Sequence, residues 1–351
     1  MKDEFILNRT VNLLCVIFLF LAIIYIRYNY DSSEIADYDA YAYFTDVYWS
    51  GFDRTWIISE PFGWGALLAL RALTGSTHGA IVVAHWLLGI FTCGAILAVA
   101  FRYRLKWQGV MLSIAMFGPL LSMVTIRATP AYLLCVAATL VVSNRRFLGV
   151  GMVAIAALFH NTALLALGPI LIIIAQQVFP KLSSPFQNKI LIVVLSSMIG
   201  TLFLLFRQDL FGLLQDAISS APGFMQKYVV YFTSGGLESA INASRENVSI
   251  FHILFIVGAT LIFILYIILS EEKQKPYRVF AVASFAIFIM LSTNPVISYR
   301  QSIFWLIPIL LTFPWERLRP GPLASIGVIA FSLVVFPLNV DGVILKWQVP
   351  T

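Results

Sequence analysis

The sequence predicts an all-α fold, a polytopic bundle of about 10 to 12 transmembrane helices. Hydrophobic residues fill 60% of its 351 positions, and charged residues fill only 11%, against about 25% in an ordinary soluble domain. A soluble fold of this length could not hide so much apolar surface. The lipid bilayer is therefore the expected solvent for most of the chain.

Apolar runs recur along the chain at lengths near the roughly 20 residues that a spanning helix needs. The first is expected to be a retained helix, because no small-residue cleavage site follows it. No internal repeat divides the chain, so 1–351 is expected to be a single transmembrane domain. The predicted membrane helices are 10–27, 79–100, 108–126, 129–143, 147–177, 189–206, 249–270, 278–294, 301–315 and 321–338.

Basic residues in the short turns predict the orientation, because loops rich in Lys and Arg stay in the cytoplasm. Placing turns such as 102–106 and 145–146 inside leaves the N-terminus cytoplasmic and the loop 28–60 outside. That loop holds seven acidic residues and a single basic one, Arg54. The polar segment 207–248 is expected on the same outer face.

This orientation constrains two further segments. The short apolar stretch 61–73 cannot be a full crossing, so it is expected to be an interfacial or re-entrant helix. The run 147–177 must begin and end inside, which favours two short helices that break near His160 and Asn161. One long tilted helix is the alternative.

The outer loop alternates acids with aromatic residues, as in Asp37-Tyr38-Asp39-Ala40-Tyr41. Asp37 and Asp39 could act as a general base or orient sugar hydroxyls, and Tyr38 and Tyr41 offer flat faces that suit sugar rings. The competing interpretation is an interfacial belt of Tyr and Trp with solvated acids.

Two more candidates for catalysis lie at breaks in the apolar pattern. Glu60 precedes Pro61 and either serves the reaction or sits at the positive end of a helix. His160 interrupts a long apolar run, where it could act as a base, donate to a phosphate, or cap a helix break. Ionisable residues near membrane depth are costly, so each is a functional hypothesis.

Arg127 and Arg300 each stand between two apolar runs. Arginine is a permanent, planar cation that can grip phosphate oxygens with two hydrogen bonds. A lipid-linked diphosphate would need such groups, and Tyr299 beside Arg300 is a further candidate for substrate binding. The alternative is that both arginines reach out to lipid headgroups.

Other chemistries find little support. Cys15, Cys93 and Cys135 all lie in apolar runs without a CxxC or Cys/His pattern, so neither a disulfide framework nor a zinc site is expected. No cofactor is predicted, although a divalent cation between Asp37 and Asp39 stays open. No basic stripe interleaved with aromatic residues predicts nucleic-acid binding.

The order of these motifs resembles the EpsG-like, Wzy-type membrane proteins that polymerise bacterial exopolysaccharide or O-antigen. The resemblance covers about residues 10–310. The matching positions are Asp37 with Tyr41 (or Asp39 with Tyr43), Glu60-Pro61-Phe62, Ile126-Arg127, Phe159-His160-Asn161-Thr162-Ala163 and Arg300.

This sequence departs from the family pattern at two motifs. Ala128 follows the arginine where Gln is common, and Thr162 stands where Ser is usual. Both departures bear on the exact reaction and substrate more than on the family.

The resemblance implies a polymerase in the bacterial inner membrane, with its active site facing the periplasm and a helical bundle similar to C-type glycosyltransferases. Its substrates would be undecaprenyl-diphosphate-linked oligosaccharides, and a chain-length regulator and a flippase are the implied partners. Arg127 and Arg300 would neutralise the leaving diphosphate, while Asp37, Asp39, Glu60 or His160 handles the acceptor proton. A flippase or transporter of lipid-linked oligosaccharide is the main alternative.

Overall fold

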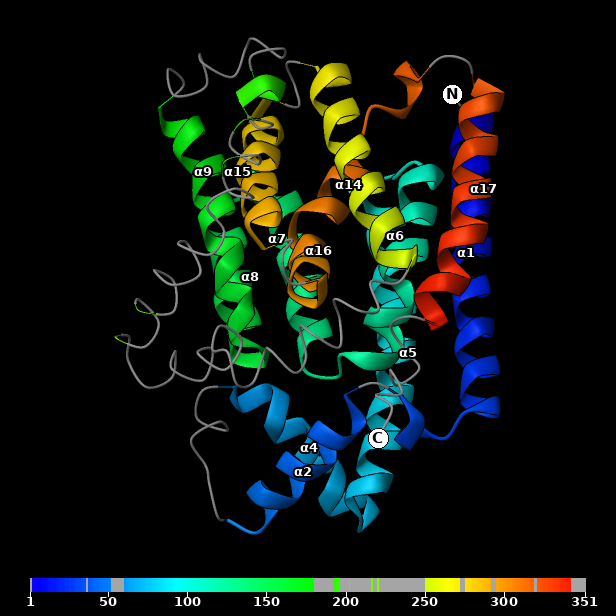
Figure 1. Cartoon of the computed structure of the whole chain (residues 1–351), viewed down its shortest axis with the longest axis vertical. Coiled ribbons are helices and arrows are strands. Elements are labelled where there is room, and N and C mark those ends of the chain that lie inside the picture. Colours follow the sequence, from blue (N-terminus) through cyan, green and yellow to red (C-terminus); the bar gives the residue numbers. More distant parts are fainter. Residues whose placement is uncertain are drawn as a thin grey trace.

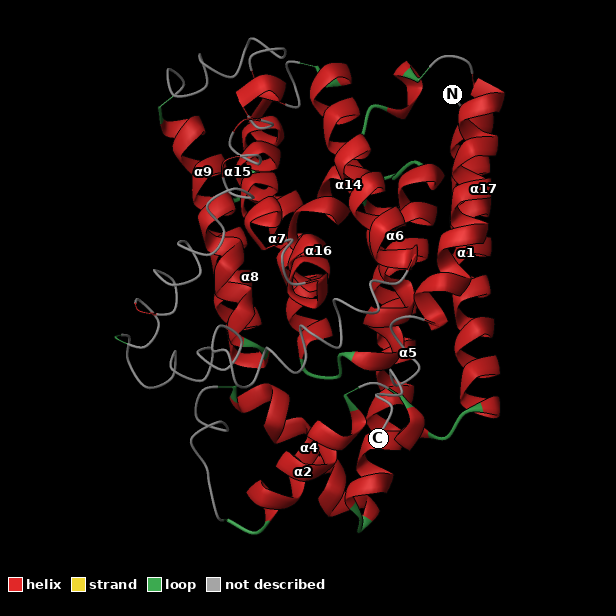
Figure 2. Cartoon of the chain, viewed as in Figure 1, coloured by secondary structure: helices red, strands yellow, loops and turns green. Residues whose placement is uncertain are grey.

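The structure, a computed structural model, describes residues 2–35, 37–51, 60–179, 192–195, 198, 202, 216, 220, 250–271, 275–291, 295–318 and 321–341. All elements with described bounds are helical (Figure 2). The α-helices are α1 (Lys2–Asn29), α2 (Tyr38–Trp49), α4 (Pro61–Thr74), α5 (Thr77–Arg102), α6 (Trp107–Pro119), α7 (Ala128–Val142), α8 (Arg146–Phe159), α9 (Leu167–Val178), α14 (Ile250–Leu269), α15 (Lys275–Leu291), α16 (Pro295–Thr312) and α17 (Gly321–Asn339). Short helical turns are η1 (Ser32–Glu34), η2 (Leu120–Val124), η3 (Asn161–Ala166) and η7 (Trp315–Arg317).

Four described helical stretches are long and apolar enough to cross a membrane: Glu4–Asn29, Thr77–Arg102, Trp107–Val124 and Asn161–Val178. They confirm the predicted all-α membrane bundle. The predicted helix 189–206 and the segment 207–248 lie outside the described residues, apart from isolated positions.

The helices form an upright bundle, with α2 and α4 as a separate layer across one end (Figure 1). Within the bundle, α6 with η2 is the most enclosed of the four candidate spans, at 78% buried, whereas α1 is 28% buried and exposes a broad apolar face. An apolar face of that kind is stable in lipid, where hydrocarbon is the solvent.

The α2–α4 layer has a hydrophobic core of its own. Its buried residues come from α2, α4 and the first turns of α5, and they are Tyr41, Tyr48, Trp64, Leu67, Ile81 and Ala84. The predicted outer loop 28–60 is therefore helical along part of its length, because its aromatic residues at i and i+7 share one face of α2. The position of this layer and of α4 relative to the bilayer stays a prediction.

Polar contacts complete the layer. Asp46 on α2 pairs with Arg71 on α4 and accepts a 2.6 Å hydrogen bond from the Thr77 hydroxyl at the start of α5. Gly75 ends α4 in the left-handed conformation, at φ 73°, and the Ser76 side chain then caps α5. The turn thus fixes α4 against α5.

The stretch 147–177 is a hairpin. Helix α8 ends at Phe159. The next residue, His160, has an extended backbone, and the chain then turns back through η3 into α9. The Arg146 Nε at the start of α8 donates to Gln177 Oε1 near the end of α9, at 2.8 Å. The two ends of the hairpin therefore lie at one level, and the alternative of a single long helix is wrong.

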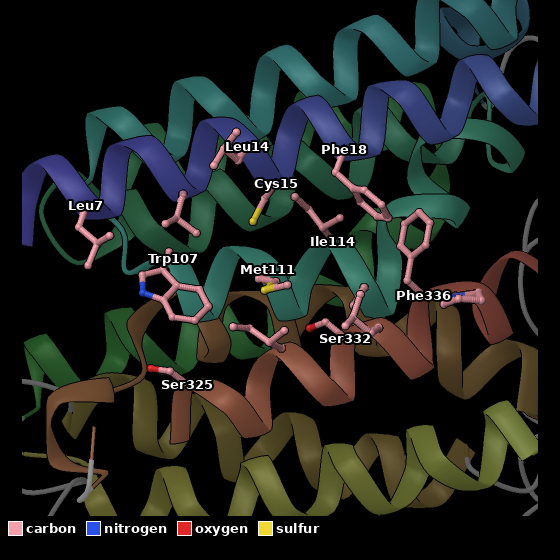
Figure 3. A pocket seen from close by; sticks show the side chains of 15 residues that line it. Leu7, Leu14, Cys15, Phe18, Trp107, Met111, Ile114, Ser325, Ser332 and Phe336 are labelled. Carbon is pink, nitrogen blue, oxygen red and sulfur yellow. The ribbon is translucent and has the colours of Figure 1, made fainter. Parts of the chain in front are cut away.

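An apolar cavity of about 490 Å³ lies between α1, α6 and α17 (Figure 3). The Phe18 and Phe336 rings lie along it and contact each other edge-on, with centroids 5.1 Å apart. None of the candidate site residues lines this cavity, so the polar chemistry of the chain lies elsewhere.

Candidate active site

Glu60 is a fully buried carboxylate at the junction of the α2–α4 layer and the bundle. It precedes Pro61 at the start of α4, but its side chain makes no capping bond to that helix. Instead, Oε2 pairs with Arg127, while Oε1 accepts hydrogen bonds from His160 Nδ1 at 2.8 Å and from the Asn161 backbone at 3.1 Å. A buried carboxylate needs such partners, and these come from α7 and the hairpin break.

Arg127 reaches this carboxylate because of an irregular turn. Helix α6 passes into the π-helical turn η2 and ends at Thr125, so that Arg127 starts α7 at the edge of the site. Its guanidinium lies 3.9 Å from the centre of the Trp64 ring and 5.7 Å from that of Tyr41. A planar cation can stack on an aromatic face and still donate from its edge to a carboxylate.

The close approach of α4 to the hairpin depends on a glycine. A Cβ atom on Gly63 would lie 2.5 Å from the Phe159 carbonyl oxygen and 3.2 Å from Arg127 Cβ. Only hydrogen fits there, because the Phe159 oxygen belongs to the backbone. Gly63 therefore sets the distance between α4, which carries Trp64, and the elements that carry Arg127 and His160.

A second ion pair joins the layer to the bundle. Arg300 Nη2 donates to Asp37 Oδ2 at 2.6 Å, across 263 positions of sequence. Asp37 precedes α2 with φ 67°, in the left-handed region. Arg300 lies inside α16, which corrects the predicted position between two helices: α16 begins at Pro295 rather than at residue 301.

Two buried tyrosines connect the two ion pairs. Tyr41 interacts electrostatically with Asp37, Arg127 and Arg300, and burial raises the pKa of its hydroxyl to about 12. Tyr132 on α7 interacts with Asp37 and Arg300, and its ring centre lies 6.5 Å from that of His160. The two pairs therefore belong to one polar site.

The structure does not bring every predicted residue into these contacts. Asp39 is exposed on α2. The Tyr38 hydroxyl lies 2.8 Å from His78 Nδ1. Tyr299 points into the bundle core, where its hydroxyl lies within hydrogen-bond distance of two acceptors, the Met116 carbonyl and Asn339 Oδ1. Roles for these three residues in substrate binding or catalysis stay predictions.

Several residues that shape the site are not among those selected from the sequence. Gly63 and Trp64 directly follow the Glu-Pro-Phe motif, so the proximity of that motif was their only signal. Tyr132 lies in an unbroken apolar helix and had no signal at all. No group of three or more possible metal ligands occurs among the described residues.

The arrangement suits proton transfer next to a developing negative charge. Because His160 Nδ1 faces Glu60, Nε2 is the ring nitrogen that can take a proton, and the carboxylate then stabilises the imidazolium. Arg127 and Arg300 both supply positive charge at this site, and both act on the Tyr41 hydroxyl.

A comparison with known protein families matches most of the chain. The sequence model of the EpsG family matches residues 11–339, a range that includes every residue of both ion pairs. No curated protein and no solved structure gives a significant match. On the family match, the chain belongs to the EpsG family, membrane proteins of polysaccharide biosynthesis.

Proposed function

We propose that this protein is a polysaccharide polymerase that joins undecaprenyl-diphosphate-linked oligosaccharides at the periplasmic face of the bacterial inner membrane. One lipid-linked glycan is the donor, and the non-reducing end of another is the acceptor. Membership of the EpsG family supports the proposal at the level of polysaccharide biosynthesis. The residues of the site support the type of reaction.

The observation that carries the proposal is the joining of Glu60, Arg127 and His160 next to the Asp37–Arg300 pair. A glycosyl transfer with a diphosphate leaving group needs a base for the acceptor hydroxyl and cations for the departing charge. Both groups are present here, whereas a structural subunit would need neither.

In the proposed reaction, the acceptor hydroxyl oxygen attacks the anomeric carbon of the donor sugar. His160 Nε2 takes the hydroxyl proton as the bond from the anomeric carbon to the diphosphate oxygen breaks. Arg127 and Arg300 stabilise the negative charge that builds up on the lipid diphosphate. The products are a glycan longer by one donor chain and the free lipid diphosphate.

The exposed fractions of the side chains distinguish the role of Glu60 from that of His160. The side chain of Glu60 is 1% exposed, so it does not meet the substrate and acts as a positioning residue for His160 and Arg127. The side chain of His160 is 18% exposed, which leaves it accessible to a hydroxyl group. Among the predicted bases, His160 is therefore the one that we assign to proton transfer.

The α2–α4 layer is the proposed binding surface for sugars. Tyr43 and Trp49 expose their rings on α2, at 65% and 51%, and Asp39 is exposed on the same helix. Flat apolar faces next to carboxylates match the alternating apolar and hydroxyl surfaces of a sugar ring.

The test uses the purified chain in lipid nanodiscs with a lipid-diphosphate-linked repeat unit and no nucleotide sugar. A ladder of longer glycans on a gel, absent from the Arg127→Ala variant, is the expected result. A ladder that persists in folded Arg127→Ala protein would overturn the role of this arginine. Movement of labelled lipid between leaflets without any ladder would favour a flippase instead.

A further inference from the structure

The two arginines of the site hold their carboxylate partners in different ways. Glu60 is 1% exposed and accepts from three groups, Arg127, His160 and the Asn161 backbone. Asp37 and Arg300 are 31% and 30% exposed, so the protein does not fully enclose either member of this pair. One carboxylate is thus fixed in the interior, while the other can leave its partner for solvent at a small cost.

We infer that the Asp37 carboxylate stands in for a substrate phosphate at Arg300 and is displaced when a diphosphate binds. This inference rests on the proposed function, because it assumes that the substrate carries a diphosphate. The edge of a guanidinium binds a carboxylate and a phosphate with the same geometry. A diphosphate brings more charge and more acceptor oxygens than one carboxylate, so it can take over Arg300 from Asp37.

The charges at the site favour exchange over simple addition. Asp37 and Arg300 form a neutral pair, and a diphosphate approaching it would meet the carboxylate as a like charge. If Asp37 stayed on Arg300, its carboxylate would lie beside the negatively charged diphosphate. Moving Asp37 into water removes that repulsion. The same carboxylate can later return to Arg300 and help to release the spent lipid diphosphate.

The backbone of Asp37 gives the exchange a structural consequence. A non-glycine residue at φ 67° is uncommon, although Asp tolerates this region better than most residues. Its contact with Arg300 joins the start of α2 to α16. When that contact opens, the start of α2 loses this link to α16, so donor binding is coupled to the helix that we propose for sugar binding.

The test measures binding of inorganic pyrophosphate to the full chain in nanodiscs of zwitterionic lipid. Removing a competitor should strengthen binding, so Asp37→Asn should bind pyrophosphate about tenfold more tightly, a gain of about 1.4 kcal/mol. Glu34→Gln is the matched control: it removes an exposed carboxylate charge three positions away, at the end of η1. Because solvent and salt screen exposed charges, it should change the affinity by less than about twofold. Arg300→Ala should lose most of the binding.

Unchanged or weaker binding in Asp37→Asn would overturn the inference, and so would an equal gain in Glu34→Gln, which would show a general charge effect. A second measurement uses the unaltered chain, in case the variant does not fold. Modification of Asp37 by a water-soluble carbodiimide, followed by mass spectrometry, should rise when pyrophosphate is added. A fall would show that the anion covers an intact pair.

The two proposals fail in different ways. Pyrophosphate binding requires no glycosyl transfer, so a chain that shows the exchange but forms no glycan ladder contradicts the polymerase proposal alone. A chain that forms the ladder, but binds pyrophosphate equally well with and without Asp37, contradicts the exchange alone.

Discussion

Glu60 and His160 are 100 residues apart in the sequence, and their side chains meet through a 2.8 Å hydrogen bond between Oε1 and Nδ1. The same Oε1 accepts from the backbone of Asn161, so it holds both residues at the point where α8 turns back into the hairpin. The carboxylate thus fixes the ring orientation of His160 and the shape of the break together.

Replacing His160 with Ala should lower the turnover number about 10²- to 10⁴-fold, the usual contribution of a positioned base. Gel analysis of glycan length over time, at saturating donor, measures this loss. His78→Ala is the control, because His78 contacts Tyr38 in the α2–α4 layer without touching Glu60. Similar losses in both variants would indicate damage to the layer rather than removal of a base.

Glu60→Gln should lower turnover by a loss that does not add to that of His160→Ala. Because Glu60 acts through His160 and Arg127, the double variant should lose little more activity than His160→Ala alone. The variant should also unfold more easily, by about 3 kcal/mol, since it leaves Arg127 without its buried partner. Fully additive losses in activity would contradict the positioning role.

Gly63→Ala should lower activity about tenfold or more, because a shift of about 1 Å in catalytic geometry is enough for such a loss. The added methyl group would meet the Phe159 carbonyl oxygen at 2.5 Å. Gly65→Ala on the same helix is the control, since a Cβ there meets nothing within 4 Å. That variant should keep its activity and gain up to about 1 kcal/mol in stability.

The orientation in the membrane can be tested with single added cysteines. Asp39→Cys should react with a membrane-impermeant maleimide on intact spheroplasts, whereas Arg146→Cys should react only after the membrane is permeabilised. The native Cys93 and Cys135 are buried and should contribute little background. Labelling of Arg146→Cys alone on intact spheroplasts would reverse the predicted topology.

Hydropathy predicted most of the helices, because a membrane helix must satisfy its backbone internally and face lipid with apolar side chains. It misplaced the start of α16, which begins at Pro295. The polar residues Tyr299 and Arg300 resemble a turn in the sequence, but in the structure they form hydrogen bonds with other elements, Tyr299 with Met116 and Arg300 with Asp37. Hydropathy alone cannot distinguish a polar turn from a helix whose polar groups are paired.

The sequence identified Glu60, Arg127 and His160 because each breaks an apolar pattern. It could not predict that they meet, since nothing local links residues 67 and 100 positions apart. Trp64 and Tyr132 could not be identified in this way, because aromatic residues are common in apolar helices and do not break the apolar pattern. Pairing of charges and stacking on rings are properties of packing, which a single sequence does not display.

The separate hydrophobic core of the α2–α4 layer has a consequence for how such a protein can change. A layer that packs on itself can accept substitutions on its outward face without disturbing the helices that hold Arg127 and His160. Selection for a new sugar could therefore act on α2 while the handling of the diphosphate stays as it is. The layer would then be the part of the molecule that varies with the sugar, while the helices that carry the reacting residues stay the same.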